Sequence, residues 1–265
     1  MSEVVRYEVH DGVAHVVIDR PEVRNAMSME VFDGLQERAA QAADDGRVGA
    51  VIVRGEGGNF SSGIDVSVFG GQADAAGAGQ DPIGGVDGIG RLQAAFTVFE
   101  ELDKPTIAAI SGFCFGAGIQ LAAACHLRAV GPDAQLSIME ARWALVPDLG
   151  GAWRIPRLVG LGRATELTLT ARKLDAAEAV AIGLAEWTLE GDDPIADVHA
   201  RAARLAAGPG AVRRAPRLLR ENLDRERGPA LLAEAETQLE CLTGPDFTEA
   251  VTATMEGRAP AFVGR

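Results

Sequence analysis

The sequence predicts an α/β fold whose sheet is largely parallel. In the N-terminal part, short apolar or β-branched runs alternate with segments of helical periodicity. From Gly162 onward the chain is rich in Ala, Leu, Glu and Arg and carries mostly helical signals. Strands that alternate with helices are typical of parallel sheets with crossover connections. With 265 residues, 47% of them hydrophobic, the chain can bury one large core, with or without an appendage.

The first elements follow from local patterns. Asp11-Gly12 is typical of a hairpin turn and separates two apolar or alternating runs. Ser28 is a candidate N-cap, with Glu30 in the first helical turn. The predicted elements are strands at 3–9 and 13–19, a helix from Ser28 to about Ala43, buried strands at 49–54 and 106–110, and a helix from about Ala117.

Residues 70–90 differ from their surroundings, because they are rich in glycine and contain no Lys or Arg. Clear periodicity resumes at Leu92, so we expect a mobile loop rather than a linker between domains.

The last third is predicted to be helical, with Asp175 as the N-cap of one helix. The expected segments are helices at 163–171, 174–183, 194–207, 211–225 and 229–256, with a short strand at 187–189.

Composition excludes several classes of function. The net charge of −13 argues against nucleic acid as a main partner, since phosphate binding needs a basic surface, although a few local cations could still hold a small anion. No stretch approaches the ~20 apolar residues of a membrane helix, and the N-terminus lacks a signal-peptide pattern. We therefore expect a cytoplasmic protein without a membrane partner.

The cysteines and histidines form no metal-binding pattern. The three cysteines, Cys114, Cys125 and Cys241, contain no C-x-x-C pair, and the four histidines are scattered. We expect buried free thiols in a reducing compartment and no metal site.

The segment Gly116-Ala117-Gly118 lies between the apolar run at 107–110 and a helical run at 119–125. Small residues let a ligand approach the backbone, and the first N–H groups of a helix lack internal partners. Such groups can hold a carbonyl oxygen that gains negative charge. The alternative is a turn that only packs a strand against a helix.

Several motifs, in this order and spacing, make the chain similar to the crotonase superfamily, the enoyl-CoA hydratase/isomerase family. They are D-R-P-E-V-R-N-A-M at 19–27, F-S-S-G-I-D at 60–65, K-P-T-I-A-A-I-S-G-F-C-F-G-A-G at 104–118, A-Q-L-S-I-M-E at 134–140, P-D-L-G-G at 147–151 and L-T-A-R-K-L-D-A-A-E-A-V-A-I-G-L at 169–184.

The resemblance implies a spiral of ββα turns over residues 1–195 and a helical trimerisation region over 196–265, with trimers that often pair into hexamers. It also implies an acyl-CoA thioester as substrate and no separate cofactor. The thioester carbonyl would accept hydrogen bonds from the backbone N–H groups of Ile64 and Ala117. Arg24 and Lys104 are candidates for contacts with CoA, with a solvated side chain as the alternative for Arg24.

The resemblance also assigns the acidic residues. Hydratases of the family use two glutamates, whose positions correspond to Gln120 and Glu140 in this chain. An amide cannot act as a general base, so Gln120 is expected to position water or substrate instead. Dienoyl-CoA isomerases of the family pair the glutamate with an aspartate at the position of Asp148. The alternatives are a solvated loop acid at Glu140 and a turn residue at Asp148.

The best-supported expectation is double-bond isomerisation of a dienoyl-CoA, with Glu140 and Asp148 transferring protons and Gln120 in support. An enoyl-CoA hydratase and a Δ3-Δ2-enoyl-CoA isomerase that uses Glu140 alone are the enzymatic alternatives. A non-catalytic protein that binds acyl-CoA or a partner, including RNA, is the alternative from another class, although the acidic composition argues against RNA.

Overall fold

The main sheet of the computed structural model, which describes residues 3–69, 83–190 and 193–264, has six strands in the order β1-β2-β3-β4-β6-β9. The first pair is antiparallel and all the following pairs are parallel, which confirms the predicted largely parallel sheet. The strands are β1 (Val5–His10), β2 (Val13–Ile18), β3 (Ala50–Gly55), β4 (Thr106–Ile110), β6 (Leu127–Val130) and β9 (Trp187–Thr188).

The predicted hairpin turn between β1 and β2 is confirmed. Asp11 and Gly12 both have positive φ, 48° and 75°, as a two-residue turn that matches the strand twist requires.

A second, three-stranded sheet was not predicted, because its strands are too short to give a clear pattern. It has the order β5-β7-β8 and consists of β5 (Phe113–Phe115), β7 (Gln135–Ser137) and β8 (Leu174–Asp175). Strand β5 leads directly through Gly116 into helix α3 (Ala117–Ala124), so this small sheet holds the predicted Gly-Ala-Gly turn in place.

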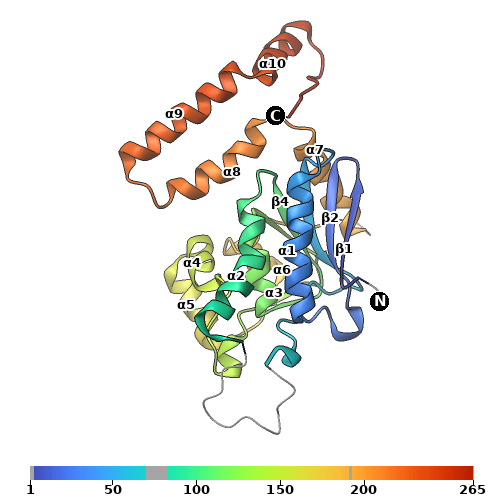
Figure 1. Ribbon diagram of the computed structural model, residues 1–265, viewed down its shortest axis with the longest axis vertical. Coiled ribbons are helices and arrows are strands. Elements are labelled where there is room, and N and C mark those ends of the chain that lie inside the picture. Colours follow the sequence, from blue (N-terminus) through green and yellow to red (C-terminus); the bar gives the residue numbers. More distant parts are fainter. Residues whose placement is uncertain (1–2, 70–82, 191–192, 265) are drawn as a thin grey trace.

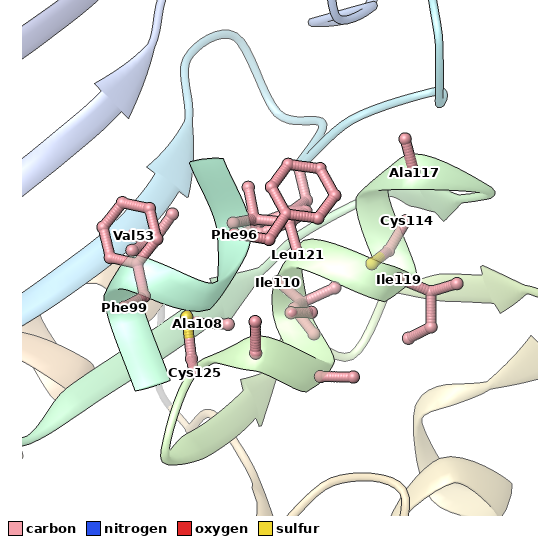
Figure 2. Close-up of a cluster of buried hydrophobic side chains, with 14 of the residues drawn as sticks. Val53, Phe96, Phe99, Ala108, Ile110, Cys114, Ala117, Ile119, Leu121 and Cys125 are labelled. Atoms are coloured by element: carbon pink, nitrogen blue, oxygen red, sulfur yellow. The ribbon is translucent and has the colours of Figure 1, made fainter. Parts of the chain in front are cut away.

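Side chains alternate between the two faces of the main sheet. In β3, Val51 and Val53 belong to the larger apolar core, whereas Ile52 belongs to a smaller core on the opposite face. Helices α1 (Met29–Asp44), α2 (Gly85–Glu101) and α3 cover the first face, and α7 (Pro194–Ala206) covers the second. Figure 2 shows Phe96 and Phe99 of α2 packed among residues of β3, β4 and α3.

Two predicted boundaries are wrong. Helix α2 begins at Gly85, within the segment expected to be a loop, and its buried face begins at Gly88, one turn before Leu92. The rest of that segment, 70–82, lies outside the described residues. The stretch at 229–256 is two helices, since Pro245 cannot donate to the preceding turn and starts a new helix instead.

The remaining helices complete the chain. As predicted, the Asp175 side chain caps α6 by accepting a hydrogen bond from the Glu178 N–H at 2.8 Å. These helices are α4 (Gly151–Val159), α5 (Leu161–Thr170), α6 (Ala176–Ala181), α8 (Ala211–Asn222), α9 (Arg227–Thr243) and α10 (Pro245–Glu256), with 3-10 helices η1 (Pro21–Val23), η2 (Val66–Phe69) and η3 (Glu140–Trp143).

Helices α8, α9 and α10 lie at one end of the molecule and stand away from the sheet (Figure 1). The boundary predicted at residues 195 and 196 falls within α7, which packs on the sheet, and the division into two regions stays a prediction. Among the described residues, no helix combines the length and apolar character needed to cross a bilayer. All three cysteines are free, but Cys241 is partly exposed rather than buried as expected.

Candidate active site

The first candidate amide belongs to Ile64, in a segment whose other N–H groups are occupied. The N–H groups of Ser61, Ser62, Gly63 and Asp65 all donate hydrogen bonds within the fold, over 2.8–3.2 Å. Within the described part of the chain, the Ile64 N–H has no such acceptor. The segment is therefore fixed by its neighbours while one amide stays available to a ligand.

The second candidate amide belongs to Ala117, the first residue of α3. Its N–H has no acceptor among the described residues, as expected for the first turn of a helix. Gly116 precedes it with φ of 54°, a conformation that favours glycine, and the Gly116 N–H donates to Ser137 O at 3.1 Å. Strand β7 thus fixes the turn that presents the Ala117 N–H.

Glycines bring the two amides together. A Cβ atom placed on Gly63 would lie 3.8 Å from Ala117 N, and one placed on Gly116 would lie 3.9 Å from Gly63 Cα. Two neighbouring N–H groups without acceptors are the type of donor pair that an oxyanion site requires, and this role stays a prediction.

Gln120 and Glu140 form the polar centre of the site. Gln120 Nε2 donates to Glu140 Oε1 at 2.6 Å, and Gln120 Oε1 accepts from the N–H groups of Leu149 and Gly151 at 2.8 and 2.9 Å. The other oxygen of Glu140, Oε2, is buried and has no hydrogen-bond partner in the described structure. The orientation of the Gln120 amide is therefore fixed, with its nitrogen toward Glu140.

Asp148 lies in the turn between η3 and α4. Its backbone carbonyl accepts a hydrogen bond from Gln93 Nε2 of α2 at 2.5 Å, and the flanking residue Leu149 is tied to Gln120. The Asp148 side chain lines the same cavity as Glu140. The structure thus brings together both predicted acids, Gln120 and both predicted amides.

The cavity has a volume of about 470 Å³. Its walls combine the predicted polar groups with apolar side chains that suit a hydrocarbon chain. One of these side chains, Trp143, is 68% exposed to solvent. The apolar lining comes from Ile64, Val66, Ile83, Ile89, Met139, Trp143, Leu145 and Leu149.

Both carboxyl groups have a raised pKa. Burial raises the pKa of Glu140, and the negative charge of Asp148 raises it further, whereas the hydrogen bond from Gln120 opposes the rise. Burial also raises the pKa of Asp148. Carboxyl groups tuned toward neutral pH suit proton transfer.

The two candidate CoA contacts differ. Arg24 is exposed and lies over the Phe113 ring at 5.5 Å, and its carbonyl accepts from the Ser62 N–H at 2.9 Å, next to the Ile64 segment. Lys104 is buried and donates to three backbone carbonyls at the end of α1. Its ammonium group is thus used within the fold, and the prediction that it contacts CoA is wrong.

Sequence reasoning missed two residues that hold the site, Gln93 and Arg154. Each is one of several polar residues on its helix, and no local motif distinguishes it from the others. A second cation over the Phe113 ring, Lys173 at 5.3 Å, was also missed.

A family model described as enoyl-CoA hydratase/isomerase matches residues 8–265. The chain therefore belongs to the enoyl-CoA hydratase/isomerase family, as its motifs predicted, and the expected crotonase fold is confirmed. A crystal structure of an enoyl-CoA hydratase from Bacillus anthracis has a TM-score of 0.90 and 26% identity and covers 99% of this chain and 100% of that one.

Full-length relatives carry both kinds of name. A peroxisomal Δ3,5-Δ2,4-dienoyl-CoA isomerase of Arabidopsis thaliana is 33% identical, over 98% of this chain and 96% of the relative. A probable enoyl-CoA hydratase of Rhodobacter capsulatus is 34% identical, over 98% of each protein. Proteins named for isomerisation and proteins named for hydration are therefore similar to this chain to nearly the same degree.

Proposed function

We propose that this protein is an acyl-CoA isomerase that moves the double bonds of a dienoyl-CoA thioester. The observation that supports isomerisation most is the occupied carboxamide of Gln120. Its oxygen accepts two backbone hydrogen bonds and its nitrogen donates to Glu140, so no acceptor is left for a proton of an attacking water. Hydration by two glutamates lacks its second base.

The reaction conserves all atoms of the substrate. Glu140 removes a proton from C2 of a 3,5-dienoyl-CoA, and the electron pair delocalises over the diene and the thioester carbonyl. The N–H groups of Ile64 and Ala117 stabilise the negative oxygen. Asp148 then delivers a proton to C6, which gives the 2,4-dienoyl-CoA. The reaction needs no cofactor besides the CoA of the substrate.

Glu140 is assigned to C2 because it is close to the amides that hold C1. A Cβ atom on Gly116, next to Ala117, would lie 3.7 Å from Glu140 Oε1. A second acid is required where a proton returns four carbons away, and Asp148 is the other carboxylate that lines the described part of the cavity.

Hydration of a 2-enoyl-CoA is the second candidate, because the similar protein from Rhodobacter capsulatus is named a hydratase. In that case Glu140 and Asp148 would act together on water. A non-catalytic acyl-CoA-binding protein is the third alternative.

A substrate panel separates these alternatives. The purified protein is offered crotonyl-CoA, a 3-enoyl-CoA and a 3,5-dienoyl-CoA, with Glu140→Gln as the inactive control. We expect rapid conversion of the dienoyl-CoA and slow hydration of crotonyl-CoA. Rapid hydration with no dienoyl conversion contradicts the proposal, and no reaction with any substrate favours the binding protein.

We also propose that Arg24 contacts the phosphates of CoA, because it is exposed beside the Ile64 segment with Lys173 over the same Phe113 ring. Arg24→Ala should then raise KM for acyl-CoA and leave kcat nearly unchanged. An unchanged KM contradicts this role. The cytoplasmic location stays a prediction.

We further propose a homotrimer or a dimer of trimers. Helix α9 buries no residue within the chain, and Leu232 and Leu239, seven residues apart, are 60% and 61% exposed. An apolar face on a helix that stands away from the core suits another copy of the chain. Light scattering should give three or six copies, and Leu232→Glu with Leu239→Glu should reduce that number; a monomeric wild type contradicts the proposal.

A further inference from the structure

The turn that carries Asp148 is held by three helices. Gln93 of α2 donates to the Asp148 carbonyl, and Gln120 of α3 accepts from the N–H groups of Leu149 and Gly151. From α4, Arg154 Nη1 donates to the Leu149 carbonyl at 3.3 Å. Both backbone polar groups of Leu149 are therefore hydrogen-bonded, the N–H to Gln120 and the carbonyl to Arg154.

Arg154 is itself fixed by a buried network. Its side chain is 6% exposed, its Nε pairs with Glu100 Oε2, and its Nη2 donates to Thr97 Oγ1 at 2.9 Å. Both partners lie on α2. Each of the three guanidinium nitrogens therefore donates a hydrogen bond. Because the group is rigid and planar, its two bonds to α2 fix the direction of the third bond, to the Leu149 carbonyl.

Two consecutive glycines let the backbone touch both side chains. A Cβ atom on Gly150 would overlap Arg154 Nη1, and one on Gly151 would lie 2.7 Å from Gln120 Oε1. Any other residue at these positions would displace the guanidinium group or the carboxamide. Gly150 therefore packs directly against Arg154, and Gly151 packs directly against Gln120.

We propose that Arg154 is a positioning residue for the reaction: it fixes the backbone of 149–151, which orients the Gln120 carboxamide so that its nitrogen donates to Glu140. The proposal rests on the proposed role of Glu140 as the base. Arg154 itself lies outside the described lining of the cavity and acts only through Leu149 and Gln120.

The network has a measurable consequence at Glu140. Burial raises the pKa of Glu140, the negative charge of Asp148 raises it further, and the hydrogen bond from Gln120 counteracts both effects. If the 149–151 backbone loses its anchor, Gln120 rotates more freely and donates less often. The acidic limb of the pH profile of kcat, which requires ionised Glu140, should then move to higher pH.

Arg154→Lys tests the proposal, because lysine keeps the charge but cannot reach all three partners. Arg128→Lys is the matched control, since Arg128 is also buried and ion-paired, with Glu186, and donates to the Cys125 carbonyl at 2.8 Å. We expect Arg154→Lys to lower kcat about tenfold or more, as small misplacements do, with little change in KM and with the acidic limb shifted. Arg128→Lys should leave the limb in place even where it lowers the thermal stability.

A double-mutant cycle distinguishes positioning from a general loss of stability. In the background of Gln120→Met, which cannot donate to Glu140, Arg154→Lys should no longer shift the acidic limb. Equal shifts with and without Gln120 overturn the proposal, as does a single Arg154→Lys variant with an unchanged pH profile.

A readout without substrate separates this proposal from the proposed reaction. Arg154→Lys should accelerate amide hydrogen exchange of Leu149 and Gly151 more than Arg128→Lys does. Unchanged exchange at these two amides overturns the positioning role whatever the enzyme catalyses, whereas faster exchange in an enzyme without isomerase activity contradicts the proposed function alone. If Arg154→Lys does not fold, Glu100→Gln, which weakens the hold on Arg154, should produce the same exchange pattern in smaller degree.

Discussion

Gln120 Nε2 lies 2.6 Å from Glu140 Oε1, although 20 residues separate the two in sequence. The contact gives Glu140 one neutral donor where a second carboxylate would have shared a proton with it. Together with the two backbone bonds to Gln120 Oε1, it makes position 120 a support for the base rather than a second base.

Gln120→Glu should change the balance between the two reactions. Two carboxylates 2.6 Å apart cannot both ionise near neutral pH. The N–H groups of Leu149 and Gly151 favour the ionised form at position 120, so the shared proton is expected to reside on Glu140. Isomerisation should fall and its acidic limb should move to higher pH, while hydration of crotonyl-CoA should rise.

Initial rates with a 3,5-dienoyl-CoA and with crotonyl-CoA from pH 5 to 10 check this prediction. Gln120→Met is the control, because it removes the amide without introducing a second acid. An isomerase rate that does not respond to the carboxylate would contradict the assigned role of Gln120.

Ala117→Pro should remove one oxyanion donor, because proline has no backbone N–H group. Ala117 is the first residue of α3, a position where proline is well tolerated in helices. Loss of one such donor typically lowers kcat about 100- to 1,000-fold. Leu161→Pro, at the exposed first residue of α5, is the matched control and should keep full activity. Equal activity of the two variants would show that the Ala117 N–H is not used.

Asp148→Asn should separate the two isomerisations. It should abolish conversion of a 3,5-dienoyl-CoA, which needs a proton donor at C6, and largely preserve conversion of a 3-enoyl-CoA, for which Glu140 alone can suffice. Parallel assays of the two substrates give the ratio directly. A variant that retains both activities would remove Asp148 from the mechanism.

Glu140→Gln should stabilise the fold at high pH. Because the pKa of Glu140 is raised in the folded state, the folded protein binds more protons than the unfolded chain between the unfolded pKa and the folded one. The stability of the wild type therefore falls as pH rises through that window, and the variant avoids this loss. Its Tm should exceed that of the wild type at pH 8, where each kcal/mol corresponds to about 2–4 °C in a chain of this size.

The Tm difference should shrink as pH falls through and below the unfolded pKa of a glutamate, about 4.3, because Glu140 then becomes protonated in both states. Glu166→Gln gives the opposite sign as a control, since the hydrogen bond from Arg172 lowers the pKa of Glu166. A Tm difference for Glu140→Gln that does not depend on pH would contradict the burial effect.

Local patterns predicted much of this fold and site. The Asp11-Gly12 turn, the Asp175 cap and the β-branched strands have strong local signals, and the motif around Ala117 predicted the turn that leads into α3. The support from Gln93 and Arg154 had no such signal, because a single polar residue on a helix can equally be solvated. Their roles depend on α2 and α4 meeting at Leu149, which is a tertiary relationship. The strands of the second sheet were missed because each is too short to give a clear pattern.

A crystal structure with a bound, non-reactive acyl-CoA tests the central claim most directly. We predict that the thioester oxygen lies about 2.7–3.1 Å from both Ile64 N and Ala117 N, with C2 facing Glu140. A thioester oxygen bound elsewhere, with both amides out of reach, would contradict the account.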